Sequence, residues 1–272
     1  MLGHPIAHSL SPVLHTAAYR ALGLTGWRYT AHDVTPDSLV GFLAGLDASW
    51  AGLSLTMPLK QAVLPLLDHL DPLAEVIGAA NTVLVQPART GSSLVGANTD
   101  VHGLVAALRE GLGDLHPTTA VVLGGGATAA SALAALAELG VTDAVVCVRS
   151  LGRSGALVRA AHRMGVAPQF RAFERAHDEI AAAEVVVATL PPHAADELAG
   201  GLSAPLAGVL LDVAYDPRPT ALSAAWARAG GVVVGGERML LHQAAEQVRL
   251  MTGRPAPLDA MAQALQEALT GR

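Results

Sequence analysis

The chain alternates short apolar runs with longer stretches in which apolar residues recur at helical spacing. Short apolar runs of about four to eight residues between turn-forming residues are typical of buried strands, and longer periodic stretches are typical of amphipathic helices. Because the two patterns alternate, they favour helices flanking mostly parallel sheets over an antiparallel fold. We therefore predict an α/β protein.

The apolar runs place the expected strands at 27–31, 51–55, 82–85, 94–95, directly after Thr119, and at 144–148, 184–189, 208–213 and 232–234. A first helix is expected to begin at Ser11-Pro12, a capping residue followed by a residue suited to the first turn, and to end at Gly23. Other helices are expected at 101–110, up to Gly140, at 238–251 and at 257–269. The glycine-bounded stretch 111–117 has the composition of a domain junction.

Composition narrows the class of protein. The 272 residues are 51% hydrophobic and only 3% aromatic, which indicates an aliphatic core and favours two domains. A net charge of -6 without a basic block argues against nucleic acid and anionic membranes as partners. No basic leader and no apolar stretch of about 20 residues is present, so we expect a soluble, cytoplasmic protein. Cys147, the single cysteine, lies in an apolar run and forms no internal disulfide.

Lys60 follows the apolar run 51–55 and Pro58, at the start of an expected helix. A cation there faces the positive end of the helix dipole, which favours release of its proton and suits a group that transfers protons near neutral pH. A solvated surface lysine is the alternative, and it is the simpler explanation of Lys60 taken alone.

The second half of the chain carries a dinucleotide-binding motif. Gly124, Gly126 and Ala129 have the spacing G-x-G-x-x-A, directly after an expected strand and before an expected helix. The first glycine permits a tight turn, the second lets backbone approach a pyrophosphate, and the alanine lets the helix pack closely on the strand. A glycine-rich turn without a ligand is the alternative.

The end of the following strand indicates which dinucleotide binds. NAD sites place a carboxylate there for the ribose hydroxyls, but residues 147–153 contain no acid. Arg149 is suited to stack on adenine and pair with a 2′-phosphate, Ser150 to donate a hydrogen bond, and Arg153 to add a second positive charge. We therefore predict NADP rather than NAD; two arginines in an exposed loop are the alternative.

Small polar residues lie at the expected ends of elements in the first half. Ser9 and Ser11 flank the start of the first helix, where hydroxyls and free amides together bind carboxylates. Capping alone explains Ser11 well and Ser9 less well. Asn81 precedes a strand and Asp100 precedes a helix, so a turn and an N-cap are the simpler explanations of each. Asp100 also offers a carboxylate to orient Lys60, if the two are close.

Together these segments resemble the shikimate dehydrogenase family over nearly the full length. The matching segments are Gly3-His-Pro-Ile-Ala-His-Ser-Leu-Ser-Pro12, Leu55-Thr-Met-Pro-Leu-Lys60, Gly78-Ala-Ala-Asn-Thr82, Asn98-Thr-Asp100, Asp212-Val-Ala-Tyr-Asp-Pro217, Met239-Leu-Leu-His-Gln243 and Met251-Thr-Gly253. The resemblance implies reversible reduction of 3-dehydroshikimate to shikimate with NADPH, in the pathway to chorismate and aromatic amino acids. It also implies a substrate-binding domain of residues 1–101 plus 238–272 and an inserted Rossmann-like NADP-binding domain of residues 102–237.

The resemblance further implies roles for individual residues. Lys60 is the expected acid/base, with Asp100 beside it. The expected substrate ligands are Ser9, Ser11, Thr56, Asn81, Tyr215 and Gln243. The expected cofactor ligands are Gly124, Gly125, Gly126, Ala127 and Thr128 for the pyrophosphate, Arg149, Ser150 and Arg153 for the adenosine phosphate, and Thr189, Val213, Gly236 and Met239 for the nicotinamide half.

Two other functions stay open at this point. One is a quinate/shikimate dehydrogenase of broader specificity, a group that often uses NAD and carries an acid near the position of Arg149. The other is a non-catalytic, dinucleotide-responsive protein of the same fold, which we expect to lack Lys60 or Asp100. No metal is expected, because Pro5 keeps His4 and His8 from sharing one helix and no acid or cysteine joins them at ligand spacing. We expect a monomer or homodimer.

Overall fold

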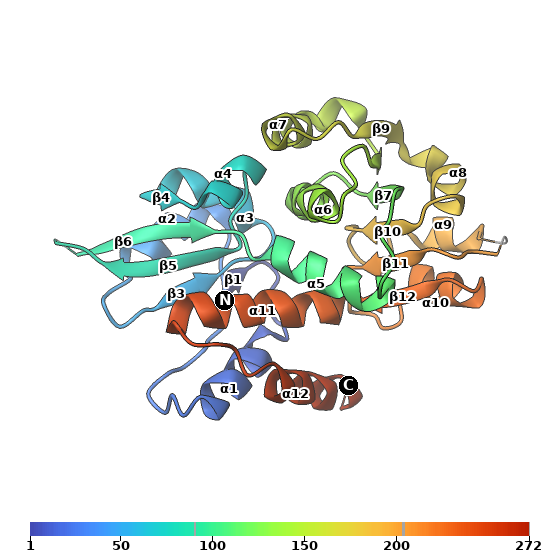
Figure 1. Ribbon diagram of the computed structural model, residues 1–272. Coiled ribbons are helices and arrows are strands. Elements are labelled where there is room, and N and C mark those ends of the chain that lie inside the picture. Colours follow the sequence, from blue (N-terminus) through green and yellow to red (C-terminus); the bar gives the residue numbers. More distant parts are fainter. Residues whose placement is uncertain (90, 203–204, 272) are drawn as a thin grey trace. The chain divides into compact units, whose positions relative to one another are not determined.

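The computed structural model describes residues 1–89, 91–202 and 205–271, and the chain divides into two compact units. One unit comprises Met1–Asp100 with Leu240–Arg272, and the other comprises Val101–Met239. The divisions fall inside two helices, α5 (Asp100–Leu112) and α11 (Gly236–Thr252), which are drawn in green and red in Figure 1. Within the described residues, no helix is long and apolar enough to cross a membrane.

The unit 101–239 is built on a six-stranded parallel sheet with the order β12-β11-β10-β7-β8-β9. Its strands are β7 (Ala120–Leu123), β8 (Val145–Val148), β9 (Gln169–Ala172), β10 (Val185–Ala188), β11 (Val209–Asp212) and β12 (Val232–Gly235). In chain order this is the arrangement 3-2-1-4-5-6 of dinucleotide-binding folds, in which ligands bind beyond the carboxyl ends of the strands. The predicted α/β class and Rossmann-like topology are confirmed.

Helices cover both faces of this sheet, which explains why most residues of its central strands β7, β8, β10 and β11 are apolar. Alternate residues of β7, β10 and β11, among them Leu123, Val186 and Leu210, pack against Ile180 and Trp226 of the helices on one face. The helices of this unit, besides part of α5, are α6 (Ala127–Glu138), α7 (Gly155–Met164), α8 (Ala176–Ala181), α9 (Asp196–Gly200) and α10 (Ala221–Arg228).

The other unit contains a four-stranded sheet with the order β3-β5-β6-β4 and a two-stranded parallel sheet of β1 and β2. Here β5 pairs antiparallel with both β3 and β6. The strands are β1 (Leu2–Gly3), β2 (His32–Asp33), β3 (Gly52–Ser54), β4 (His69–Leu70), β5 (Thr82–Pro87) and β6 (Ser92–Ala97). The helices are α1 (Ser11–Ala21), α2 (Pro36–Ala44), α3 (Leu59–Ala62), α4 (Pro72–Ile77) and α12 (Leu258–Thr270), with most of α11. Its apolar core includes Leu2, Leu39, Leu53 and Leu59, each at most 1% exposed.

The strand predicted at 27–31 is wrong. The strand in this region is β2, which is only two residues long and pairs with Leu2–Gly3. Residues 27–31 have no strand partner at their side, and Tyr29 instead stacks its ring on His15 at a centroid distance of 4.0 Å. The strands β4 and β9 were not predicted, because both are short and their sequences contain polar residues.

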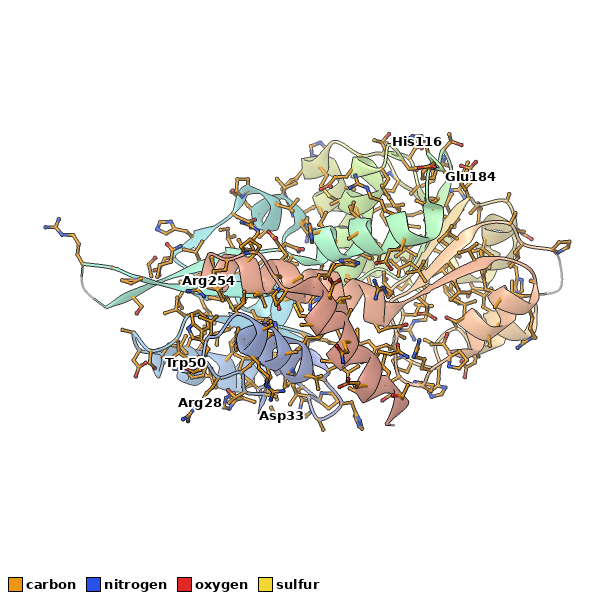
Figure 2. All side chains as sticks on the ribbon, turned by 60° about the horizontal axis from the view of Figure 1, so that its bottom comes forward. Arg28, Asp33, Trp50, His116, Glu184 and Arg254 are labelled. Atoms are coloured by element: carbon orange, nitrogen blue, oxygen red, sulfur yellow. The ribbon has the colours of Figure 1, made fainter. Side chains whose placement is uncertain are left out.

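Glu184, labelled in Figure 2, joins the starts of two strands in the unit 101–239. Its Oε2 accepts hydrogen bonds from the backbone nitrogens of Thr118 (2.6 Å) and Thr119 (3.2 Å) and from the Thr118 hydroxyl (3.0 Å). These bonds to the charged form lower the pKa of Glu184. The carboxylate therefore holds the residues just before β7 next to the residue just before β10.

Candidate active site

Lys60 and Asp100 form an ion pair in the unit that contains both ends of the chain. The Nζ atom of Lys60 lies 2.6 Å from Oδ2 of Asp100, and the two side chains are 15% and 4% exposed. Lys60 is also the only lysine in the sequence, which contains 17 lysines and arginines in total. A shielded ion pair of this kind is costly to desolvate, so it indicates a chemical role rather than simple stabilisation.

Two expectations about this pair are corrected. The helix that carries Lys60, α3, has only four residues and begins after Pro58, so it has almost no dipole to act on the lysine. Asp100 is not an N-cap but the first residue of α5, and its own backbone nitrogen donates to Oδ1 of Asn98 at 3.0 Å. The Asp100 carboxylate is thereby left for Lys60.

Asn81 and Gln243 lie beside the pair. The Nδ2 atom of Asn81 donates to Oδ1 of Asp100 (2.7 Å), and the Thr99 hydroxyl (2.9 Å) and Oε1 of Gln243 (3.2 Å) lie within hydrogen-bonding distance of the same nitrogen. Asn81 is 1% exposed and Gln243 is 8% exposed. The structure therefore brings together four predicted site residues that come from four separate places in the sequence.

The capping explanation, which suited Ser11 better than Ser9, is exchanged between the two serines in the structure. The hydroxyl of Ser9 accepts a hydrogen bond from the backbone nitrogen of Ser11 at 3.3 Å, so Ser9 assists the helix start that was assigned to Ser11. Ser11 is the first residue of α1, is 1% exposed, and its hydroxyl has no hydrogen-bond partner within the described residues. A buried polar atom of this kind is rare in native proteins and marks a position where a ligand is expected to bind.

Thr56 and Tyr215 belong to different units. Thr56 lies in the turn between β3 and α3, where its backbone nitrogen donates to the carbonyl oxygen of Leu2 (2.9 Å) and its methyl group contacts Gly3 so closely that no larger residue fits there. Tyr215 follows β11 in the unit 101–239 and is half-buried. Its predicted contact with the substrate stays a prediction.

A buried polar cluster next to these residues was missed by the sequence reasoning. It consists of His15, Tyr29, Ser54 and Gln247, and the Gln247 amide contacts all but the tyrosine. The spacing of the sequence could have indicated it. Gln247 lies one helical turn after the predicted site residue Gln243, and His15 lies one turn after Ser11, so each pair shares a helix face. Burial lowers the pKa of His15 to about 3 despite its hydrogen bond to Gln247. Burial raises the pKa of Tyr29, and its hydrogen bond with Ser54 offsets part of that rise.

The glycine-rich turn after β7 has the geometry of a phosphate-binding loop. Gly124 has φ +118°, and a Cβ at this position would lie 2.5 Å from the Thr189 hydroxyl. Gly126 is the N-cap of α6 and faces open space, so backbone amides of the first turn (Ala127, Thr128) lie at an accessible helix start that no side chain caps. These features fit a dinucleotide pyrophosphate.

The predicted adenosine-phosphate residues are available to a ligand. Arg149, Ser150 and Arg153 follow β8 and are all exposed. No acidic residue lies between Asp143 and Glu174, so this surface keeps its positive charge. The arrangement fits a phosphate on the ribose better than free ribose hydroxyls.

The residues predicted near the nicotinamide follow the carboxyl ends of other strands. Thr189 follows β10 and donates from its hydroxyl to the carbonyl oxygen of Leu123 at 3.0 Å, so it also supports the turn at Gly124. Gly236 packs directly on the Val213 backbone, and Met239 is buried in the first turn of α11. All four lie in the same unit as the glycine-rich turn.

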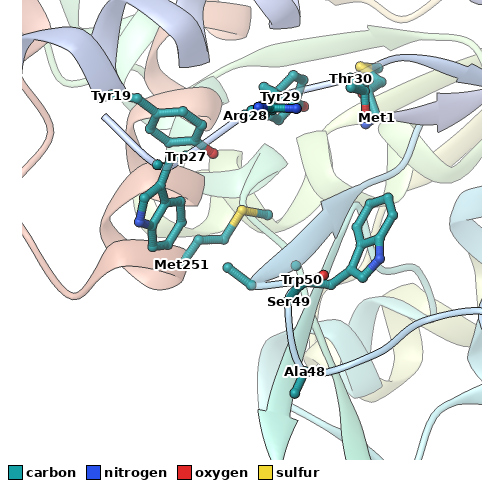
Figure 3. Close-up of a pocket in the computed structure, with 13 residues that line it drawn as sticks. Met1, Tyr19, Trp27, Arg28, Tyr29, Thr30, Ala48, Ser49, Trp50 and Met251 are labelled. Carbon is teal, nitrogen blue, oxygen red and sulfur yellow. The ribbon is translucent and has the colours of Figure 1, made fainter. Parts of the chain in front are cut away.

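A separate cavity of about 570 Å³ lies in the unit that contains Lys60 (Figure 3). Trp27 and Trp50 flank it, and Tyr29 and Met251 also contribute to its wall. None of the predicted site residues lines this cavity. Two residues of its wall contact the polar cluster: the Tyr29 hydroxyl donates to Ser54 at 2.7 Å, and the Tyr19 hydroxyl lies 3.5 Å from Nδ1 of His15.

Comparison with known proteins covers nearly the whole chain. Residues 1–83 match the shikimate dehydrogenase substrate binding domain, 236–266 the shikimate 5′-dehydrogenase C-terminal domain, and 119–214 the family of NADP oxidoreductases described as coenzyme F420-dependent. The shikimate dehydrogenase (NADP(+)) of Geobacter sp. strain M21 is 39% identical over 274 residues, 97% of this chain and 93% of that protein. That of Methanothermobacter thermautotrophicus is 33% identical over 276 residues, covering 99% and 95%.

Solved structures give the same result. Mycobacterium tuberculosis shikimate dehydrogenase is 45% identical, with a TM-score of 0.86 over 98% of this chain and 97% of that one. The Thermus thermophilus shikimate 5-dehydrogenase in complex with NADP(H) and shikimate is 32% identical, with a TM-score of 0.80 over 98% and 97%.

His15 makes stability depend on pH. The unfolded chain takes up a proton near pH 6.5, whereas native His15 resists protonation down to about pH 3, so stability falls as the pH drops through this window. Between pH 7 and pH 5 the loss from this residue is about 2 kcal/mol. Denaturant unfolding of wild type and His15→Gln at both pH values measures it; equal losses in the two proteins would contradict the assignment.

The unpaired Ser11 hydroxyl predicts an unusual response to truncation. Removing a buried hydroxyl that has no partner leaves the free energy of unfolding unchanged or raises it. Ser54→Ala is the matched control: Ser54 is also buried, but it loses bonds with Tyr29 and Gln247, so we expect a loss of about 1–3 kcal/mol. A comparable loss in Ser11→Ala, measured by thermal unfolding, would show that its hydroxyl is already satisfied.

Proposed function

Since the chain belongs to the shikimate dehydrogenase family, we propose that it catalyses the reversible, NADP-dependent interconversion of 3-dehydroshikimate and shikimate. This is an oxidoreductase reaction at a CH–OH group, on the route to chorismate and the aromatic amino acids. The observation that carries the proposal for this chain is the Lys60–Asp100 ion pair, shielded from solvent and surrounded by amide groups.

Lys60 is the acid/base in this proposal. In the direction of reduction, an oxygen on the ring gains negative charge as the carbonyl becomes a hydroxyl, and the Lys60 ammonium supplies the proton that it needs. In the direction of oxidation, the same nitrogen takes up the hydroxyl proton. The Asp100 carboxylate, 2.6 Å away, holds the lysine in place for both.

The neighbouring polar groups orient the substrate. Asn81, Gln243 and Thr56 offer amide and hydroxyl groups to the ring hydroxyls, as the family resemblance implies. Ser9 and Ser11 hold the substrate carboxylate, and the unpaired buried hydroxyl of Ser11 supports this role. Holding the substrate in this way places its reacting oxygen next to the Lys60 nitrogen before the reaction begins.

The unit 101–239 is the NADP-binding domain in this proposal, and the unit with Lys60 is the substrate-binding domain. When bound there, NADPH would supply the hydride for reduction, and NADP+ would accept it in the direction of oxidation. The residues Gly124 to Thr128 hold its pyrophosphate, while Arg149, Ser150 and Arg153 hold the adenosine phosphate. Thr189, Val213, Gly236 and Met239 lie on the nicotinamide side, and Tyr215 reaches the substrate. A monomer or homodimer stays our prediction.

The two alternatives are less well supported by this chain. The broader quinate/shikimate enzymes that use NAD carry an acid near the position of Arg149, and here an exposed arginine is present. A non-catalytic binding protein is expected to have lost the acid/base pair, which is intact.

Lys60→Gln tests the acid/base role. Glutamine retains a hydrogen-bond donor toward Asp100 but has no proton to transfer, so we expect kcat to fall by about 10² to 10⁴ while KM for shikimate changes little. The measurement is NADP-linked oxidation of shikimate followed by absorbance, with circular dichroism to verify folding. Unchanged kcat in folded Lys60→Gln would refute the role of Lys60, and no activity in the wild type would refute the proposed function.

Arg149→Gln tests the preference for NADP. Losing a paired guanidinium should reduce kcat/KM for NADP by about 10-fold or more, because a charge-assisted hydrogen bond contributes about 1.5–3 kcal/mol. The value for NAD, which has no 2′-phosphate, should change little. Arg228→Gln, an exposed arginine on α10, is the control and should leave both values unchanged. Equal losses for NADP and NAD would assign Arg149 a role other than phosphate recognition.

A further inference from the structure

Gln247 is a second buried glutamine on α11, one turn beyond Gln243, and it is 1% exposed. Its Nε2 donates to the Thr82 hydroxyl (3.0 Å) and to the carbonyl oxygen of Asn81 (3.3 Å). Its Oε1 accepts from the Ser54 hydroxyl (2.8 Å) and from Nε2 of His15 (3.2 Å). The two donor and two acceptor positions of the amide are all used, so its orientation is fixed.

The direction of each hydrogen bond around Gln247 follows from this orientation. Since Oε1 carries no proton, Ser54 and His15 must donate to it, and the Tyr29 hydroxyl in turn donates to Ser54 at 2.7 Å. Neutral His15, whose pKa burial lowers to about 3, therefore carries its proton on Nε2. At the amide nitrogen, Gln247 donates to the Thr82 hydroxyl oxygen. The Thr82 hydroxyl proton is therefore free to be donated to Asn81.

The chain of hydrogen bonds ends at the ion pair. The Thr82 hydroxyl donates to Oδ1 of Asn81 at 2.9 Å, and the backbone nitrogen of Thr99 donates to the same atom at 2.8 Å. The amide nitrogen of Asn81 therefore faces Asp100, to which it donates at 2.7 Å. With the amide reversed, its carbonyl oxygen would face the carboxylate, which also receives Lys60.

We propose that Gln247 and Thr82 are positioning residues for the acid/base pair: they fix the Asn81 amide, which holds the Asp100 carboxylate in the orientation that receives Lys60. Every donor in this series points the same way, from Tyr29 toward Asp100, and such chains strengthen one another's hydrogen bonds. The inference rests on the proposed function for its catalytic meaning. Its structural content concerns only the environment of Lys60.

The environment of Lys60 is directly measurable, because the chain contains a single lysine. Protein labelled with ¹³C at lysine Cε gives one lysine signal by nuclear magnetic resonance, and this signal and its titration midpoint report the pairing with Asp100. Thr82→Val removes the hydroxyl but keeps the branched shape of a buried strand residue. Thr82→Ser keeps the hydroxyl.

We expect Thr82→Val to move the lysine signal and its midpoint, and to lower kcat for NADP-linked shikimate oxidation about fivefold, with KM for NADP unchanged. Thr82→Ser should return these quantities toward the wild-type values. Thr252→Val is the control. It also removes a threonine hydroxyl that donates a hydrogen bond, here to the carbonyl oxygen of Val248 on α11, and it should change neither the lysine signal nor kcat. In an Asn81→Ala background, Thr82→Val should cause no further loss of kcat, since it acts through Asn81.

A lower melting temperature in Thr82→Val with the lysine signal and kcat unchanged would overturn the inference, since the cluster would then serve folding alone. Gln247→Met provides a second variant that breaks the chain one step earlier, and it must move the lysine signal in the same direction. An inactive wild type would overturn the proposed function, and the lysine signal would then decide the inference by itself.

Discussion

The ion pair between Lys60 and Asp100 is the constraint on which the unit that contains both ends of the chain depends. Two charges that are 15% and 4% exposed lose most of their hydration, and their attraction compensates for that loss only if hydrogen bonds satisfy the remaining atoms. Here Asn81 occupies the second carboxylate oxygen. The amide oxygen of Asn81 in turn requires hydrogen-bond donors, and its amide nitrogen requires acceptors. Thr82, Thr99 and Gln243 supply these groups, which explains why they are buried around Asn81.

The sheet supplies the positions for this cluster through its register. Thr82 pairs with Ser54 on one side and with Ala97 on the other, so the start of β5, the end of β3 and the end of β6 meet at one edge. Asn81 precedes β5 directly, Lys60 follows β3 after one turn, and Asp100 follows β6 after two residues. Residues some 20 and 40 positions apart are therefore brought together by backbone pairing, and α11 adds its glutamines from a part of the sequence much further along.

Local patterns predicted the unit 101–239 well and the other unit less well, for a physical reason. A parallel sheet covered on both faces requires continuous apolar runs, and the glycine turn at Gly124 has a local conformational cause, so both are legible in sequence. The strand at 27–31 failed because strand formation depends on a partner, and β1 offers only Leu2–Gly3. The dipole effect predicted for Lys60 is wrong, because α3 has only four residues and its dipole is correspondingly small.

The site residues divide in the same way. Lys60, Asp100, Asn81 and Gln243 were predicted from short motifs, but each had a simpler explanation alone, and only their distances distinguish an assembled site from separate caps and turns. Ser9 and Ser11 lie in one motif, and both are candidates to cap the helix. Only the atomic positions show that the Ser9 hydroxyl accepts from the Ser11 backbone nitrogen, while the Ser11 hydroxyl has no partner among the described residues. Gln247 lay outside every motif, because a residue that acts by satisfying other buried groups is recognisable only when those groups are in place. Its position one turn from Gln243 means that a single face of α11 serves both the ion pair and the groups that orient it.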